Sequence, residues 1–146
     1  MRRVHSKIDN RYYDAKDMLT KAFKLIRKQK IIARQNFSCC GSCASYDIGA
    51  SITEKRNLGK KLPIGAVFYS RQGEEQFKRT GKVYLNFMPA DSSLKGDEHD
   101  EETKKVGLIV TDTLRSVGLN VVWNGDSHMT IQTGLWNEEE LAVINH

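Results

Sequence analysis

The sequence predicts an α+β domain: a roughly four-stranded, mainly antiparallel sheet with all its helices on one face, two of them long, and a Cys-rich metal knot. Three observations predict this fold. Two long segments repeat apolar residues at helical spacing, several short runs are rich in branched and aromatic residues, and all three cysteines lie within five consecutive positions. We expect one domain over residues 1–146, made of a basic helix (about 10–33), the knot (36–43, called here the cysteine loop) and an α+β body (64–136).

The first helix is predicted from an apolar stripe within residues 10–33, and Asp9 or Asn10 can cap its start. The stripe recurs at steps of three and four residues and includes Tyr12, Ala15, Leu19, Ala22 and Ile26. Cations cover the other faces, namely Lys16, Lys21, Lys24, Arg27, Lys28 and Lys30. This basic surface is either a solvated face or a surface that binds nucleic acid.

The middle of the chain alternates strand and helix signals. Residues 44–57 are compatible with either a short strand or a helix. Residues 64–70 are rich in branched and aromatic side chains and predict a strand, and residues 82–88 alternate apolar with polar side chains in the same way. Between them, residues 73–80 predict a short helix that Gly81 ends.

The last third of the chain predicts a second long helix over residues 98–117, which Gly118 ends. Strands over 119–123 and 128–133 follow. They lie on either side of Asn124-Gly125, a dipeptide typical of a β-hairpin. The last two strands are therefore antiparallel, and residues 138–146 predict a short closing helix.

The cysteine loop predicts a metal site, most simply for Zn²⁺. Cys40 and Cys43 have the two-residue gap that lets both sulfurs reach one ion, and Cys39 is the third candidate ligand. His128 is the first candidate for a fourth ligand. Asp47 and Glu54 are oxygen candidates, and water completes the site if none of them reaches the ion.

Two alternatives to a metal site remain open for these cysteines. Buried thiols behave as small apolar side chains. A nucleophilic cysteine with His128 as its base would make the protein a thiol enzyme.

Charge is distributed unevenly along the chain. Residues 1–61 hold 15 Lys and Arg against 5 Asp and Glu, whereas residues 62–146 hold 8 against 13. Such a split predicts surfaces of opposite sign that can steer charged partners. The candidate partner-binding residues are Asp97, Glu98, Asp100, Glu101, Glu102, Lys24 and Lys28.

The expected compartment is the cytoplasm. No apolar run approaches the roughly 20 residues of a membrane span, and residues 1–7 carry no apolar segment typical of a secretion signal. An odd number of clustered cysteines also suits a reducing compartment better than a disulfide framework.

Four segments resemble an uncharacterised bacterial domain family. These are residues 34–43 with the pattern Asn-Phe-x-Cys-Cys-x-x-Cys, then 65–72, 81–85 and 118–125. The resemblance implies a small cytoplasmic α+β protein and a metal, without an activity. The chain departs from the family pattern at Ser70, where histidine is usual, and at Gly73, where an acid is usual. If that histidine is a zinc ligand in relatives, this chain completes the site otherwise or leaves a position open.

A small, Lys-rich, zinc-carrying chain without a catalytic constellation is also similar in type to phage-encoded, zinc-containing anti-CRISPR inhibitors. That likeness implies a non-enzymatic protein that acts through a protein–protein interface. Its partner would be a type II CRISPR nuclease, whose basic channel the acidic residues 97–102 would engage. The alternatives are a nucleic-acid-binding protein and a zinc- or thiol-dependent enzyme.

Overall fold

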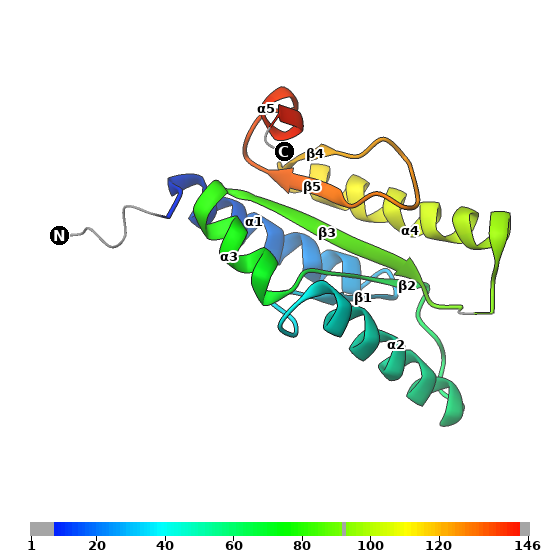
Figure 1. Cartoon of the computed structure of the whole chain (residues 1–146). Helices are drawn as coiled ribbons and strands as arrows, with labels where there is room; N and C mark the ends of the chain where they lie inside the picture. Colours follow the sequence, from blue (N-terminus) through cyan, green and yellow to red (C-terminus); the bar gives the residue numbers. More distant parts are fainter. Residues whose placement is uncertain (1–7, 92, 144–146) are drawn as a thin grey trace.

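The computed structural model describes residues 8–91 and 93–143 as a sheet between helices (Figure 1). The helices are α1 (Asn10–Arg27), α2 (Gly41–Asn57), α3 (Arg71–Thr80), α4 (Gly96–Ser116) and α5 (Glu138–Val143). The strands are β1 (Ile31–Arg34), β2 (Gly65–Phe68), β3 (Lys82–Pro89), β4 (Asn120–Val122) and β5 (Ile131–Gly134). They form one five-stranded sheet in the order β1-β2-β3-β5-β4.

The sheet is mainly antiparallel, as predicted, and has one strand more than the four expected. β1 and β2 are parallel, and the other three pairings are antiparallel. The antiparallel register places Val67 opposite Phe87 and Val83 opposite Thr133. The predicted α+β class is confirmed.

Helices cover both faces of the sheet, so the prediction of helices on one face only was wrong. Alternate residues along each strand point to opposite faces. Val67, Val83 and Leu85 pack with the buried sides of α1 and α4, in the larger apolar cluster. Ala66 and Phe68 pack with α2 on the other face, in a smaller cluster.

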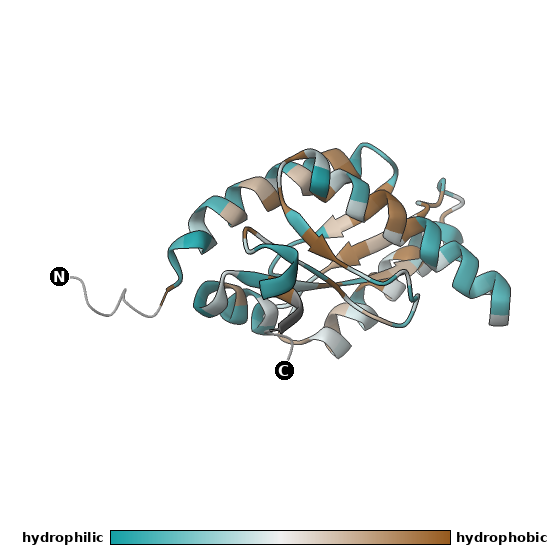
Figure 2. Cartoon of the chain, turned by 90° about the horizontal axis from the view of Figure 1, so that it is seen from above, coloured by the Kyte–Doolittle hydropathy of each residue, from teal (hydrophilic) through white to brown (hydrophobic). Residues whose placement is uncertain are grey.

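Hydropathy along the chain follows these layers. Figure 2 shows apolar residues concentrated on the strands and on the sheet-facing sides of the helices, with hydrophilic residues outward. None of the helices in the described part of the chain combines the length and the apolar character that a membrane crossing requires.

The first helix is shorter than the predicted 10–33, because α1 ends at Arg27 and residues 31–34 form β1. Asp9 caps its start by accepting a hydrogen bond from the Arg11 amide. Lys30 turns the chain with a left-handed backbone (φ 67°). The left-handed residue that follows a helix is usually glycine, because glycine carries no steric penalty in this conformation. A lysine at that position gives no such signal in the sequence.

Residues 44–57 belong to α2, which resolves the ambiguity between strand and helix. Ala44, Ile48 and Ile52 are its buried residues. They recur every four residues and form a stripe only one side chain wide. A stripe this narrow gives little periodic signal, because the surrounding positions are polar or small.

The loop of the hairpin predicted around Asn124-Gly125 is longer than expected, because β4 ends at Val122 rather than at 123 and β5 begins at Ile131 rather than at 128. Gly125 does adopt the left-handed backbone expected of a turn (φ 85°). The Asn124 and Asp126 side chains accept hydrogen bonds from backbone amides two residues further on. These local bonds offer the chain an alternative to extending the strand ladder.

One buried carboxylate ties α1 to α3. Glu74, 3% exposed, accepts hydrogen bonds from the Tyr12 hydroxyl (2.5 Å), the Tyr69 hydroxyl (2.8 Å) and the Lys16 ammonium (2.5 Å). Burial raises the pKa of Glu74, but the bonds from Lys16 and the two tyrosines outweigh burial and hold it below its ordinary value. The charged carboxylate is therefore the form that holds these two helices together.

Candidate metal centre

The cysteine loop crosses the carboxyl ends of the parallel strands β1 and β2. The Phe37 amide donates to the Tyr69 carbonyl (2.9 Å), and the Arg71 amide donates to the Ser38 carbonyl (3.0 Å). Asn36 and Ser38 adopt left-handed backbones (φ 50° and 68°). These bonds and turns bring the chain back from β1 into the start of α2, with the cysteines at the bend.

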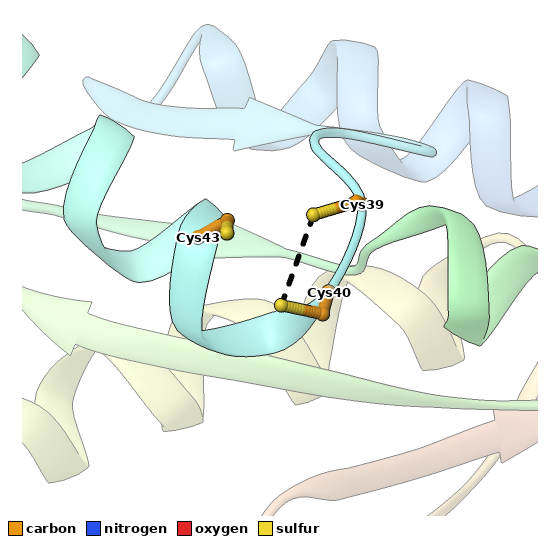
Figure 3. A group of neighbouring side chains, drawn as sticks. All are labelled: Cys39, Cys40 and Cys43. Carbon is orange, nitrogen blue, oxygen red and sulfur yellow. Dashed lines mark hydrogen bonds between the residues drawn. The ribbon is translucent and has the colours of Figure 1, made fainter.

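The three sulfurs converge on one point. The Sγ atoms of Cys39, Cys40 and Cys43 all lie within 4.8 Å of one another, and those of Cys39 and Cys40 are 3.9 Å apart. Figure 3 shows Cys39 and Cys40 projecting from the loop toward the side of α2 that carries Cys43. Thiolates at 2.3 Å from a tetrahedral ion are about 3.8 Å apart. The group can therefore hold a metal ion after small side-chain adjustments.

The group is at the molecular surface, because Cys39 and Cys43 are exposed and Cys40 is half-buried. The alternative of three buried apolar thiols is therefore wrong. The sulfurs are free thiols and not bridged to one another. Since Cys39 and Cys40 are neighbours in the sequence, the bend that turns the chain into α2 is what aims both sulfurs the same way.

The first turn of α2 shapes the electrostatics of the thiols. Cys40 is the N-cap of α2, and the backbone amide of Cys43, followed by the thiols of Cys43 and Cys39, lowers the pKa of Cys40. The thiols of Cys39 and Cys40, beside Cys43, raise the pKa of Cys43 to about 11. A thiolate at one of the three close sulfurs thus disfavours a second thiolate, because the two negative charges repel each other. A bound cation offsets that repulsion.

His128, predicted as the fourth ligand, lies elsewhere. It is in the loop between β4 and β5, and its Nε2 is 3.5 Å from the Asp100 carboxylate of α4. The Ser127 hydroxyl donates to the same carboxylate at 3.1 Å. Within the described part of the chain, no histidine or carboxylate joins the three sulfurs inside the 4.8 Å that groups them. His128 is also the base that the thiol-enzyme alternative predicted, and the structure does not place it beside the sulfurs.

Asp47 supports the cysteine loop from α2, and Glu54 does not. The Asp47 carboxylate accepts a hydrogen bond from the Ser38 hydroxyl at 2.9 Å, which fixes the left-handed residue just before Cys39. Glu54 lies further along α2, beside a surface groove. Sequence reasoning treated Asp47 as a possible ligand and missed this supporting role, although Asp47 is four residues after Cys43 and so shares its helix face.

The departures from the family pattern lie beside this loop. Ser70 is buried and caps α3, with its hydroxyl accepting a bond from the Gly73 amide at 3.3 Å. The side chain of Ser70 is thus engaged in starting α3.

The predicted partner-binding residues form two separate surfaces. The acidic ones lie on the first turns of α4, where Asp97, Glu98, Glu101 and Glu102 line a cavity of about 390 Å³. Asp100 is engaged with the β4–β5 loop, as described above. Lys24 and Lys28 are exposed at the end of α1.

Comparison with known proteins yields one family. Neither the curated proteins nor the solved structures include a match to this chain. None of the comparisons bears on the anti-CRISPR likeness, which stays a prediction. Residues 11–138 match the model of a domain of unknown function, DUF6891, and this range includes α2, α3, α4, all but the first residue of α1, the whole sheet and the cysteine loop. The chain belongs to the DUF6891 family.

Proposed function

We propose that the protein binds one Zn²⁺ through Cys39, Cys40 and Cys43. The observation that carries the proposal is the convergence of three surface thiols within 4.8 Å. Thiolate sulfur favours soft or borderline metals such as zinc over Mg²⁺ or Ca²⁺, which prefer oxygen ligands. With three ligands from the chain, the fourth position is taken by water or by a donor atom of a partner molecule.

Zinc would join the bend of the cysteine loop to the first turn of α2. Cys39 precedes that helix, Cys40 caps it and Cys43 lies within it, so one ion adds a further link between the loop and α2 to the hydrogen bond from Ser38 to Asp47. Metal binding at such a site is coupled to local folding. This role is structural and needs no catalytic group.

The test is metal content together with thermal stability. Protein purified from zinc-supplemented culture is expected to contain about one zinc per chain by elemental analysis. Cys40→Ser and Cys43→Ser are expected to lose the zinc and to melt at a lower temperature. Ser42→Ala is the matched control, since it alters the same loop without removing a thiol. A wild-type protein that contains no zinc and gains no stability from added zinc contradicts the proposal.

Cobalt substitution distinguishes a closed site from an open one. Co²⁺ in a closed four-ligand thiolate site gives intense visible bands that added imidazole or thiol leaves unchanged. We expect a spectrum that shifts when an external ligand is added, because the chain supplies three ligands. An unchanged spectrum would mean that a fourth protein ligand completes the site.

We further propose that the protein acts without catalysis, through an interface with another protein. Supporting this are the acidic cavity on α4 and the exposed Lys24 and Lys28 on α1, which present opposite charges to a partner. A type II CRISPR nuclease is the partner that the likeness in type suggests. Co-purification of the tagged protein with such a nuclease, lost on Glu98→Lys plus Glu101→Lys, is the expected outcome. If the purified nuclease and this protein do not associate, the CRISPR proposal fails, while the zinc proposal is unaffected.

A further inference from the structure

A second cavity lies near the opposite end of α2 from the cysteines. It has a volume of about 260 Å³ and is lined by Arg27, Lys30, Ile31, Ile32, Lys55, Lys61, Leu62 and Pro63, which define what we call the basic cavity. These residues come from the end of α1, the start of β1, the last turns of α2 and the loop that follows. Four of the eight are cations and none is acidic.

The four cations have no acidic partner in the described part of the chain, where none of the ion pairs includes Arg27, Lys30, Lys55 or Lys61. The carboxyl ends of α1 and α2 offset some of this charge. Each helix end contributes roughly −0.5 of an elementary charge, so two ends offset about one cation of the four. Backbone amides of residues 28–30 and 58–60 already cap the last helix carbonyls. A net positive charge of about three therefore surrounds a recess that none of the described acidic residues lines.

Two of the four cationic residues of the basic cavity, Arg27 and Lys30, are held in place by hydrogen bonds. The Arg27 Nε donates to the Ala33 carbonyl at 3.1 Å, which orients the guanidinium and leaves its terminal nitrogens for another acceptor. The left-handed Lys30 donates its amide to the Arg27 carbonyl (3.1 Å) and accepts from the Ile64 amide (2.7 Å). A fixed guanidinium beside several ammonium groups matches the oxygens of a phosphate group, which accept charge-assisted hydrogen bonds from both.

We propose that the basic cavity binds phosphate groups. Its volume is below the roughly 300–1,000 Å³ of pockets that enclose a whole small molecule, so one or two phosphate groups enter and the rest of the ligand stays outside. Buried Ile31 and half-buried Leu62 and Pro63 form apolar walls beside the cations. The same chemistry can come from a free phosphorylated small molecule or from the backbone of a single-stranded nucleic acid.

The first experiment measures pyrophosphate binding by calorimetry at low salt. We expect one site per chain, and about tenfold weaker binding in the double variant Lys55→Gln plus Lys61→Gln, which removes two of the four cations. Lys104→Gln on α4 is the matched control, because Lys104 is an exposed lysine outside the cavity, and it is expected to bind like the wild type. Circular dichroism melting checks that each variant is folded.

The second experiment distinguishes the two sources with a fluorescent single-stranded oligonucleotide. Binding that weakens steeply with salt, and that pyrophosphate displaces, identifies the nucleic-acid backbone as the source. Pyrophosphate binding with no oligonucleotide binding identifies a small phosphorylated molecule. The proposal is overturned if neither probe binds, or if Lys104→Gln weakens binding as much as the double variant.

This proposal does not depend on the metal. The Cys43→Ser variant should lose zinc and still bind the phosphate probe like the wild type, since Cys43 and the basic cavity lie toward opposite ends of α2. Loss of probe binding in the folded Cys43→Ser variant would place the anion at the thiols and would contradict the assignment to the basic cavity.

Discussion

The two faces of the sheet differ in how much apolar surface covers them. The face under α1 and α4 contributes to a core of 19 buried apolar residues, whereas the face under α2 contributes to one of 7. α2 is held by a stripe of three side chains, yet it carries the thiols at one end and lines the basic cavity near the other. Stability is thus concentrated on one side of the sheet, whereas the candidate metal site and part of the lining of the basic cavity belong to the other, as expected if functional segments are the less stable ones.

The largest expected effect that tests this contrast comes from truncating a side chain of the larger core. Changing Phe23, which is fully buried on α1, to alanine is expected to lower the free energy of unfolding by about 3–5 kcal/mol. Ile48→Ala on α2 is the comparison, with an expected cost near 2 kcal/mol, because the lightly held helix can move into the vacated space. Urea denaturation followed by circular dichroism measures both. If the two variants lose equal stability, the two sides are anchored alike and the contrast is wrong.

The next effect concerns the buried carboxylate on the well-packed side. Glu74→Gln removes the charge that Lys16 and two tyrosines surround, and we expect a loss of about 3 kcal/mol at neutral pH, at the low end for a broken buried pair since Lys16 is partly exposed. Glu75→Gln, at an exposed position on the same helix, is the control with little effect.

The same carboxylate predicts a pH dependence. The pKa of Glu74 in the folded protein is below its ordinary value of 4.5. Its contribution is therefore fully present above about pH 4.5 and is lost as the pH falls through the lowered value. The stability difference between wild type and Glu74→Gln should shrink as the pH is lowered below 4.5. A difference that stays constant down to pH 3 would show that the charge is not what stabilises the helix pair.

Much of the well-packed side was predictable from sequence, because its helices and strands repeat apolar residues with clear periods. α4 and β3 follow their predicted ranges to within two residues, and Gly81 ends α3 as expected. The first strand and the side under α2 were harder to predict. β1 follows a left-handed lysine rather than a glycine, and the three-residue stripe of α2 has almost no periodic signal.

The candidate sites likewise contain parts that were predictable from the sequence and parts that were not. The three cysteines were predictable as a group because they are close in sequence, and a short bend can bring their sulfurs together. His128 was not predictable as a partner of Asp100, since that contact depends on how the β4–β5 loop packs on α4. The basic cavity joins residues 27–32 to residues 55–63, and only the tertiary fold brings these segments together.

Zinc should reduce the difference between the two sides by fastening α2. Amides in the first turns of α2 are expected to exchange with solvent faster than those of α1 and α4 in the metal-free protein. At free zinc 100 times the Kd, an opening that breaks the site costs about 2.7 kcal/mol more, which slows exchange there about 100-fold. Hydrogen–deuterium exchange with and without zinc measures this. Equal slowing in α4 would mean that zinc stabilises the whole domain rather than this helix.

The smallest effect tests the support that α2 gives to the cysteine loop. Asp47→Ala removes the acceptor of the Ser38 hydroxyl, so the left-handed residue before Cys39 loses a constraint and the three sulfurs are less well arranged before metal binds. We expect zinc affinity to fall about tenfold, the lower end for groups that orient metal ligands without binding the ion. Competition with a chromophoric chelator measures the Kd. Glu54→Ala, two turns further along α2, is the matched control and should bind zinc like the wild type.

Asp47→Asn keeps an acceptor for Ser38 and should recover most of the affinity if Asp47 positions the loop. Failure of Asp47→Asn to recover it, with Asp47→Ala still impaired, would instead make the Asp47 carboxylate a ligand of the metal.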